Sequence, residues 1–222
     1  DIYRLQGRSV LARDALRMAY DFAKSSGDHL AEAYALHLQA SILLEEKLVD
    51  GAEILAIQGL ASIDLYIQNQ IEPDLIYTSL QSSLYQLLSR CEFARNSIHE
   101  AWKQALRAME LAETRGSAIE IGNTYMLYGL FSAQFPDQRP AGMSHNFDDY
   151  FQIALRQFRS ARAEPEIASL YLDYARSLHH HQRTAEAIPL LEQAVELFKR
   201  LRRPVGLFNA AALLANYRAH QT

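Results

Sequence analysis

The sequence predicts an all-α protein of about nine to ten antiparallel helices, and three observations support this fold class. Apolar residues recur at three- and four-residue spacing through most of the chain, which is the pattern of amphipathic helices. The 222 residues include only 9 Gly and 6 Pro, and the glycines fall mainly between the periodic segments. No segment alternates apolar and polar residues for long enough to predict a strand.

Each helix follows from its own spacing and from the residues at its ends. In the first full segment, the predicted apolar face includes Ala15, Leu16 and Phe22. Gly27 and Asp28 then provide a helix end and the cap of the next helix. Helices are expected at residues 1–6 (the end of one), 9–26, 29–46 and 51–69, from Pro73 to near Cys91, at 97–115, at 117–134, from Phe147 to about Arg162, as a pair within Glu166–Lys199, and from Pro204 onward.

One real loop is predicted, over Phe135–Asn146, because this stretch contains two prolines and a glycine. Three aromatic residues follow it closely, Phe147, Tyr150 and Phe151. They either shape a ligand pocket beside the loop or fill the space left by an irregular junction.

A pair of a small residue and a larger apolar residue recurs on every second helix, at intervals of 44, 46, 49 and 40 residues. The small residue lets a neighbouring helix approach closely, while the larger one fills the gap beside it. The pairs are Ala15-Leu16, Gly59-Leu60, Ala105-Leu106, Ala154-Leu155 and Ala194-Val195.

The stretch Glu166–Lys199 resembles a tetratricopeptide repeat. Its first helix carries Tyr171, Tyr174, Ala175 and Leu178 at the motif positions, and its second carries Ala187, Leu191 and Ala194. The spacing exceeds the usual period of about 34 residues, so the helices are longer than in the common repeat. This long-helix variant is similar to the C-terminal repeat arrays of bacterial signal-transduction ATPases, transcriptional regulators and adenylate cyclases.

The resemblance implies a right-handed α-α superhelix, a solenoid of about four to five repeats whose first helices line a concave groove. Residues 1–222 are then one repeat domain, which we expect to be an excised part of a longer protein. Groove positions follow from the small residues Ala40, Gly129 and Ala175. They are Tyr34, His37 and Ser41; Asn123, Met126 and Leu130; and Ser169, Leu172, Arg176 and His179. In the second pair either Ser82 or Ser83 has this place, and neither is included.

Residues that suggest chemistry have simpler explanations. Three adjacent imidazoles, His179 to His181, point in different directions on a helix and do not converge on one metal ion. Cys91 is expected to fill the core, and the basic cluster Lys199–Arg203 is expected to offset a helix dipole. No phosphate loop, zinc-binding spacing or nucleophile motif is present. We therefore expect no catalytic residue, no metal and no cofactor.

Composition excludes several partners. The net charge of -4 gives no general attraction to nucleic acid or to an anionic membrane. No apolar run approaches the length of a membrane-spanning helix. The chain contains 1 Cys, so it has no internal disulfide, and a reducing, cytoplasmic location is expected.

Two functions remain open. The first is a non-catalytic scaffold that binds a peptide or partner protein in its concave groove. The alternative is a small-molecule sensor module of a bacterial multidomain regulator. The last helix still has an apolar face, with Leu207, Phe208 and Leu214. We expect this face to be covered by another domain or another chain, or to be the edge at which a longer repeat array was truncated.

Overall fold

The computed structural model describes residues 9–70 and 76–219, which form ten α-helices and no strand. The all-α prediction is confirmed. The predicted helix end at residues 1–6 and the predicted start at Pro73 lie outside the described residues. The helices are α2 (Ser9–Ser26), α3 (His29–Glu45), α4 (Val49–Gln68), α5 (Ile76–Ala94), α6 (Ile98–Arg115), α7 (Ala118–Gln134), α8 (Phe147–Ser160), α9 (Glu164–His180), α10 (Thr184–Arg200) and α11 (Pro204–Ala219).

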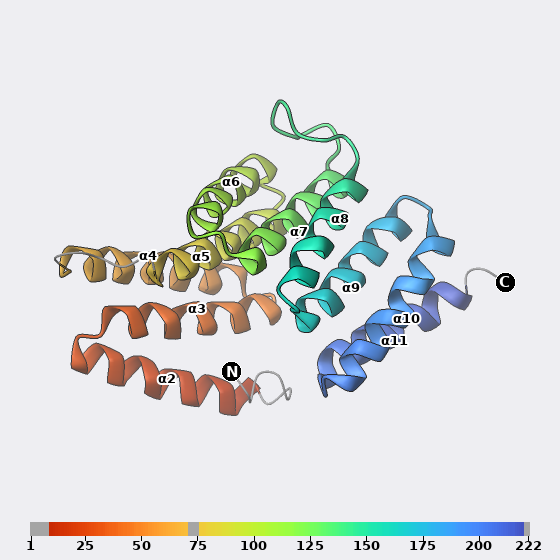
Figure 1. Ribbon diagram of the computed structural model, residues 1–222. Helices are drawn as coiled ribbons and strands as arrows, with labels where there is room; N and C mark the ends of the chain where they lie inside the picture. The colour runs from red at the N-terminus through yellow and green to blue at the C-terminus, as the bar shows by residue number, and fades with distance from the viewer. Residues whose placement is uncertain (1–8, 71–75, 220–222) are drawn as a thin grey trace. The chain divides into compact units, whose positions relative to one another are not determined.

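These helices belong to two compact units, divided within α7 after Glu120. In unit 1, α2 to α6 pack consecutively, and α3 with α4 and α5 with α6 form the most extensive pairs. In unit 2, α8 packs on α9, α9 on α10 and α10 on α11. Figure 1 shows these neighbouring helices side by side and antiparallel within each unit. No described helix has both the length and the apolar character needed to cross a membrane.

Seven interhelical turns have the same construction. In each of these turns of the described residues, a residue one or two positions after the helix end takes a left-handed conformation, with φ between 54° and 71°. The N–H of the next residue then bonds back to the carbonyl five residues earlier, as Ala163 does to Phe158 at 2.9 Å. This is the Schellman motif, which satisfies carbonyls at the helix end. The left-handed residues are Gly27, Lys47, Asn96, Gly116, Arg162, Gln182 and Arg202.

The repeated turn predicts opposite effects of two substitutions. Arg162→Gly should raise the free energy of unfolding by about 0.5–1 kcal/mol, because glycine removes a left-handed strain of about 1–2 kcal/mol and loses part of this gain to chain entropy. Gly116→Ala should lower it by about 1 kcal/mol. A Cβ at Gly116 would meet no atom within 4 Å, so only the backbone conformation opposes it. Urea denaturation followed by circular dichroism measures both, and effects of the same sign would contradict the prediction.

The close packing of α5 on α6 depends on small residues. Ser82 Oγ donates to the carbonyl of Ala108 at 2.9 Å, and Ser89 Oγ donates to the carbonyl of Ala101 at 2.7 Å. A buried hydroxyl needs a partner, and a backbone carbonyl is within reach only where the opposite helix presents alanine. Serine and alanine together therefore set the spacing between these helices.

In unit 2, two glycines of α7 each face a phenylalanine of α8. A Cβ at Gly122 would lie 2.5 Å from Phe158 Cε1, and a Cβ at Gly129 would lie 2.8 Å from Phe151 Cε2. Both phenylalanines are fully buried. The small residue thus lies on α7 and the large one on α8, so the phenylalanine rings fill the space beside the α7 backbone.

Two of the sequence-based expectations for side chains need correction. Gly59, Ala105, Ala154 and Ala194 are buried as expected, whereas Ala15 is exposed. Leu16, next to it, is buried as expected, so the predicted face of the first helix was too wide. Phe22, placed on the same face, is 75% exposed. The error arises because α2 has apolar residues on two faces, which spacing alone does not separate.

Candidate functional site

A cleft in unit 1 is the best candidate for a binding site. Its volume is about 1000 Å³, at the upper end of the range for ligand pockets. It lies beside the C-terminal half of α2 and the N-terminal halves of α3 and α5. Its lining consists of Leu16, Ala19, Phe22, Ala23, Ser26, Asp28, Leu30, Ala31, Tyr34, Ala35, His37, Leu38, Ile76, Ser79, Leu80, Ser83, Arg115 and Glu120.

Local sequence explains how each helix faces the cleft. Asp28 caps α3 by accepting a hydrogen bond from the N–H of Ala31 at 3.0 Å, which places the first turn of α3 at the cleft. Tyr34 and His37 lie one turn apart on α3, with ring centroids 6.5 Å apart. Ser79 and Ser83 also lie about one turn apart, on α5, and both face the cleft because residues four apart share a helix face.

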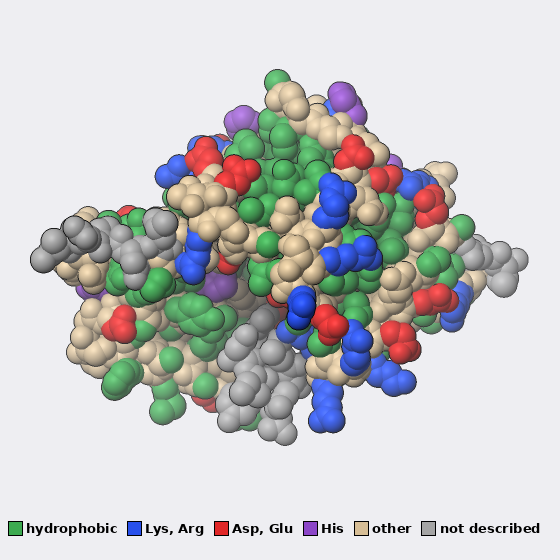
Figure 2. Space-filling view, in the orientation of Figure 1, with side chains coloured by type: hydrophobic (Ala, Val, Ile, Leu, Met, Phe, Trp, Pro, Cys, Tyr) green, Lys and Arg blue, Asp and Glu red, His purple; other side chains and the backbone are tan. Residues whose placement is uncertain are grey.

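Three large apolar side chains of the cleft lining are strongly exposed. Phe22 is 75% exposed, Tyr34 57% and Ile76 53%. Figure 2 shows hydrophobic side chains at the surface over α2 and α3. Exposed aromatic area of this kind favours contact with an apolar partner surface.

Polar groups of the cleft are held at its α5 side. Arg115 Nη1 donates to the carbonyl of Ile76 at 3.0 Å, which ties the end of α6 to the start of α5. Gln86 Nε2 donates to the carbonyl of Glu120 at 3.0 Å and so anchors the first turn of α7. The cleft therefore combines apolar walls with one guanidinium, two carboxylates and the imidazole of His37, an arrangement suited to binding and orientation.

The structure brings some of the predicted groove residues together. Tyr34 and His37 both line the cleft, whereas Ser41 does not and donates to the carbonyl of His37 at 2.9 Å. Of the two serines considered on α5, Ser82 is buried against α6 and Ser83 lines the cleft. Sequence reasoning missed Ser79, Leu38, Arg115 and Glu120 as lining residues, since no local pattern distinguishes them.

The predicted groove residues of unit 2 have different surroundings. Met126 is 3% and Leu172 7% exposed, so both are core residues of this unit. The remaining predicted groove residues are half-buried or exposed. Asn123 is half-buried on α7, Leu130 packs against the core, Ser169 donates to Pro165 O, Arg176 pairs with Asp173, and His179 stacks on Tyr217 with ring centroids 3.9 Å apart.

The three adjacent histidines have different surroundings. His179 Nδ1 lies 2.9 Å from Thr184 Oγ1. His181 Nε2 donates to the carbonyl of Ala133 at 2.8 Å, because a carbonyl can only accept, and its ring stacks on Phe147. His180 is exposed. Within residues 9–70 and 76–219, no three His, Cys, Asp or Glu side chains are grouped so that they could hold a metal ion.

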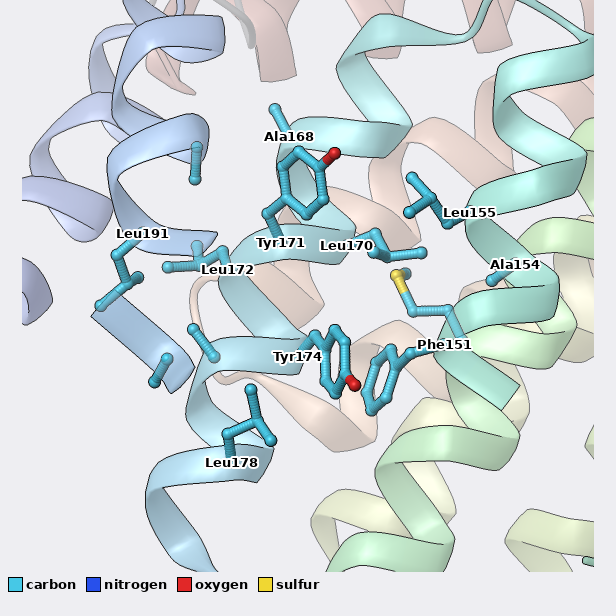
Figure 3. Packing of buried hydrophobic residues seen from close by; sticks show 14 of the residues in the cluster. Phe151, Ala154, Leu155, Ala168, Leu170, Tyr171, Leu172, Tyr174, Leu178 and Leu191 are labelled. Carbon is cyan, nitrogen blue, oxygen red and sulfur yellow. The ribbon is translucent and has the colours of Figure 1, made fainter. Parts of the chain in front are cut away.

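The aromatics after the long loop fill space in unit 2. Phe147, Tyr150 and Phe151 are 7%, 4% and 0% exposed. Phe151 stacks on Tyr174 with ring centroids 4.6 Å apart, and Figure 3 shows the two rings face to face between α8 and α9. Cys91 is likewise fully buried in unit 1, where burial raises the pKa of its thiol to about 11.

A polar network closes this aromatic core at the start of α8. Tyr174 donates from its hydroxyl to Asp148 Oδ1 at 2.8 Å, and Arg183 donates to Asp148 Oδ2 at 2.7 Å. Burial, together with the hydrogen bond to Asp148, raises the pKa of Tyr174 to about 12. Hydrogen bonds to both carboxylate partners, Glu186 and Asp148, raise the pKa of Arg183.

The raised tyrosine pKa predicts how stability depends on alkaline pH. The unfolded phenol ionises near its ordinary pKa of 10, whereas folded Tyr174 keeps its proton up to about 12. Its contribution is therefore fully present below pH 10 and is lost as pH rises through about 12. Tyr174→Phe should lose about 1–3 kcal/mol at neutral pH with the hydrogen bond to Asp148. The difference from wild type should shrink above pH 10 in urea denaturation series, and a constant difference would contradict this account.

Comparison with known proteins supports the fold. No family model matches the chain, and a search of curated proteins gave no match. The crystal structure of BtubC (BKLC) from P. vanneervenii is similar, with a TM-score of 0.59. The alignment covers 97% of this chain and 87% of that chain, at 16% sequence identity. The chain shares the fold of BtubC. At this identity the likeness concerns the arrangement of helices alone.

Proposed function

We propose that this chain is a tetratricopeptide-like helical repeat array that acts as a non-catalytic scaffold for protein–protein interaction. The repeat assignment is supported by the shared turn at seven helix ends and by the buried small residues at Gly59, Ala105, Ala154 and Ala194. Helix pairs of this kind stack as a right-handed superhelix.

The observation that carries the binding function is the unit 1 cleft with its exposed apolar residues. Phe22, Tyr34 and Ile76 together expose more aromatic and aliphatic surface than a site for a polar ligand needs. Aromatic residues at such positions are typical anchors of protein interfaces. The cleft therefore takes an apolar segment of a partner protein, and Arg115, Glu120 and His37 orient it.

A cleft-filling substitution tests this function. Ser83→Trp places an indole in the cleft, next to Leu80, and should abolish binding of peptides selected on the wild type from a random display library. The matched control is Ser97→Trp, at a half-buried position before α6 that is not part of the cleft. Circular dichroism melts establish that both variants are folded. Selected peptides that bind wild type and Ser83→Trp equally would rule out the cleft as the site.

The cleft volume supports a second function, a small-molecule sensor in a cytoplasmic signalling protein. A volume of about 1000 Å³ accommodates an organic metabolite as well as a peptide segment. A ligand that binds only the folded state raises its stability by an amount that grows with concentration. A thermal-shift screen with metabolites, repeated on Ser83→Trp, separates the two functions. Stabilisation of the wild type alone would favour the sensor.

A further inference from the structure

The helix α2 has two apolar faces, of which only one is packed. Ala12 and Leu16 are buried with Ile42 of α3. The second face consists of exposed residues at spacings of four, three and four, which we call the α2 stripe. The α2 stripe comprises Leu11, Ala15, Met18 and Phe22.

The large apolar side chains of the α2 stripe are strongly exposed. Leu11 is 46%, Met18 73% and Phe22 75% exposed. Phe22 also lines the unit 1 cleft, so the stripe leads into that cleft. A comparable exposed set on α4, including Ile54 and Ile57, does not line it.

The spacing of the α2 stripe fits a helix better than an extended peptide. A repeat averaging about 3.7 residues, close to the 3.6 residues of a helical turn, keeps apolar side chains in one line along the helix, which is the seam that a second helix packs against. The stripe extends over about 16 Å, or three helical turns. A partner helix satisfies its own backbone hydrogen bonds, whereas an extended peptide needs polar groups along its path, and the stripe itself presents none.

One flank of the α2 stripe carries two carboxylates. Asp14 and Asp21 are exposed and seven residues apart, so they lie on the same side of α2. Neither carboxylate has a hydrogen bond or ion pair with the described residues. The cations Arg17 and Lys24 lie about 60° further around the helix, away from the stripe. A partner helix in register with the stripe therefore meets negative charge on this flank.

This charge arrangement disfavours a second copy of the chain as the partner. In a two-fold symmetric contact the same patch of both copies meets, so an antiparallel pair of α2 helices would place Asp14 and Asp21 against their counterparts. Like charges across an interface oppose association. Opposite charge on the partner removes this repulsion.

We infer that the α2 stripe docks an amphipathic α-helix of another protein, whose apolar seam is flanked by lysine or arginine residues that face Asp14 and Asp21. The inference rests on the proposed binding function and specifies the chemistry of the partner. The docked helix packs along α2 and reaches the unit 1 cleft at Phe22.

Three synthetic peptides of about 18 residues test this inference at physiological ionic strength. They carry the same leucine seam at helical spacing, flanked by lysine in the first and by glutamate in the second. The third has the composition of the first in scrambled order, so that it has no apolar face. Fluorescence anisotropy should show binding of the lysine-flanked peptide at least about tenfold tighter than of either other peptide.

Matched variants locate the binding surface. Phe22→Ser with Met18→Ser should weaken binding of the lysine-flanked peptide about tenfold or more, whereas Phe208→Ser, which alters a phenylalanine of similar exposure on α11, should leave it unchanged. Asp14→Asn with Asp21→Asn should remove most of the preference for lysine over glutamate. The control pair Asp64→Asn with Glu113→Gln removes the same charge elsewhere in unit 1 and should preserve the preference.

Several outcomes overturn the inference. Equal binding of the lysine- and glutamate-flanked peptides, binding of the scrambled peptide, no binding at all, or unchanged binding by the Phe22 and Met18 variant would each do so. Display-selected peptides that bind wild type but not Ser83→Trp would still support the proposed function in that case. The two failures are therefore distinguishable.

Discussion

Phe151→Ala is expected to lower the free energy of unfolding of unit 2 by about 3–5 kcal/mol. The ring of Phe151 is 0% exposed, stacks on Tyr174 at 4.6 Å and occupies the space that Gly129 leaves on α7. Removing the ring loses its transfer free energy and leaves a cavity that three packed helices cannot easily close. Urea denaturation followed by circular dichroism measures the change.

Phe208→Ala is the matched control for this effect. Phe208 has the same side chain but is 72% exposed on α11, so its removal should change the free energy of unfolding by less than about 0.5 kcal/mol. Similar effects of the two substitutions would mean that the packing of α7, α8 and α9 does not support unit 2 as described.

Gly129→Leu is expected to lower the free energy of unfolding by about 2 kcal/mol. A Cβ alone would lie 2.8 Å from Phe151 Cε2, and the leucine branches extend further into the same ring. Overpacking of this degree costs about 3 kcal/mol, of which the better helix propensity of leucine returns about 1 kcal/mol.

The double variant Gly129→Leu with Phe151→Ala tests whether the two residues share one space. Leucine then fills part of the cavity left by the ring, so the double variant should be more stable than the sum of the single effects by about 1–3 kcal/mol. Additive effects would show that position 129 and position 151 do not compete for the same volume.

The helices themselves could be predicted from the sequence because their signals are local. Three- and four-residue spacing marked every described helix, and Gly27, Asp28 and Gly116 marked ends that the structure confirms. The other turns were harder to see. Lys47, Asn96 and Arg162 adopt the same left-handed conformation as the glycines, and nothing in these residue types requires it. Their conformation follows from the packing of the two helices on either side.

Only part of the candidate site was predictable for the same reason. Tyr34 and His37 were predicted because the resemblance to the repeat motif gives groove positions relative to the small residue Ala40. Arg115 and Glu120 belong to the cleft only because α5, α6 and the start of α7 meet there, and no local pattern records such a meeting. Ser82 and Ser83 are adjacent and point about 100° apart around α5. Which of them lines the cleft depends on how α5 is rotated against its neighbours, and the sequence does not give this rotation.

The sequence by itself determined that the chain is all-helical, where most helices begin and end, and which small residues allow close approach. These properties depend on backbone preference and on spacing along one helix. The tertiary structure alone decided which of the two apolar faces of α2 is buried, that Phe151 fills the space beside Gly129, and that a cleft opens beside α3. Those properties depend on contacts between residues far apart in the chain, because burial is set by what a neighbouring helix covers.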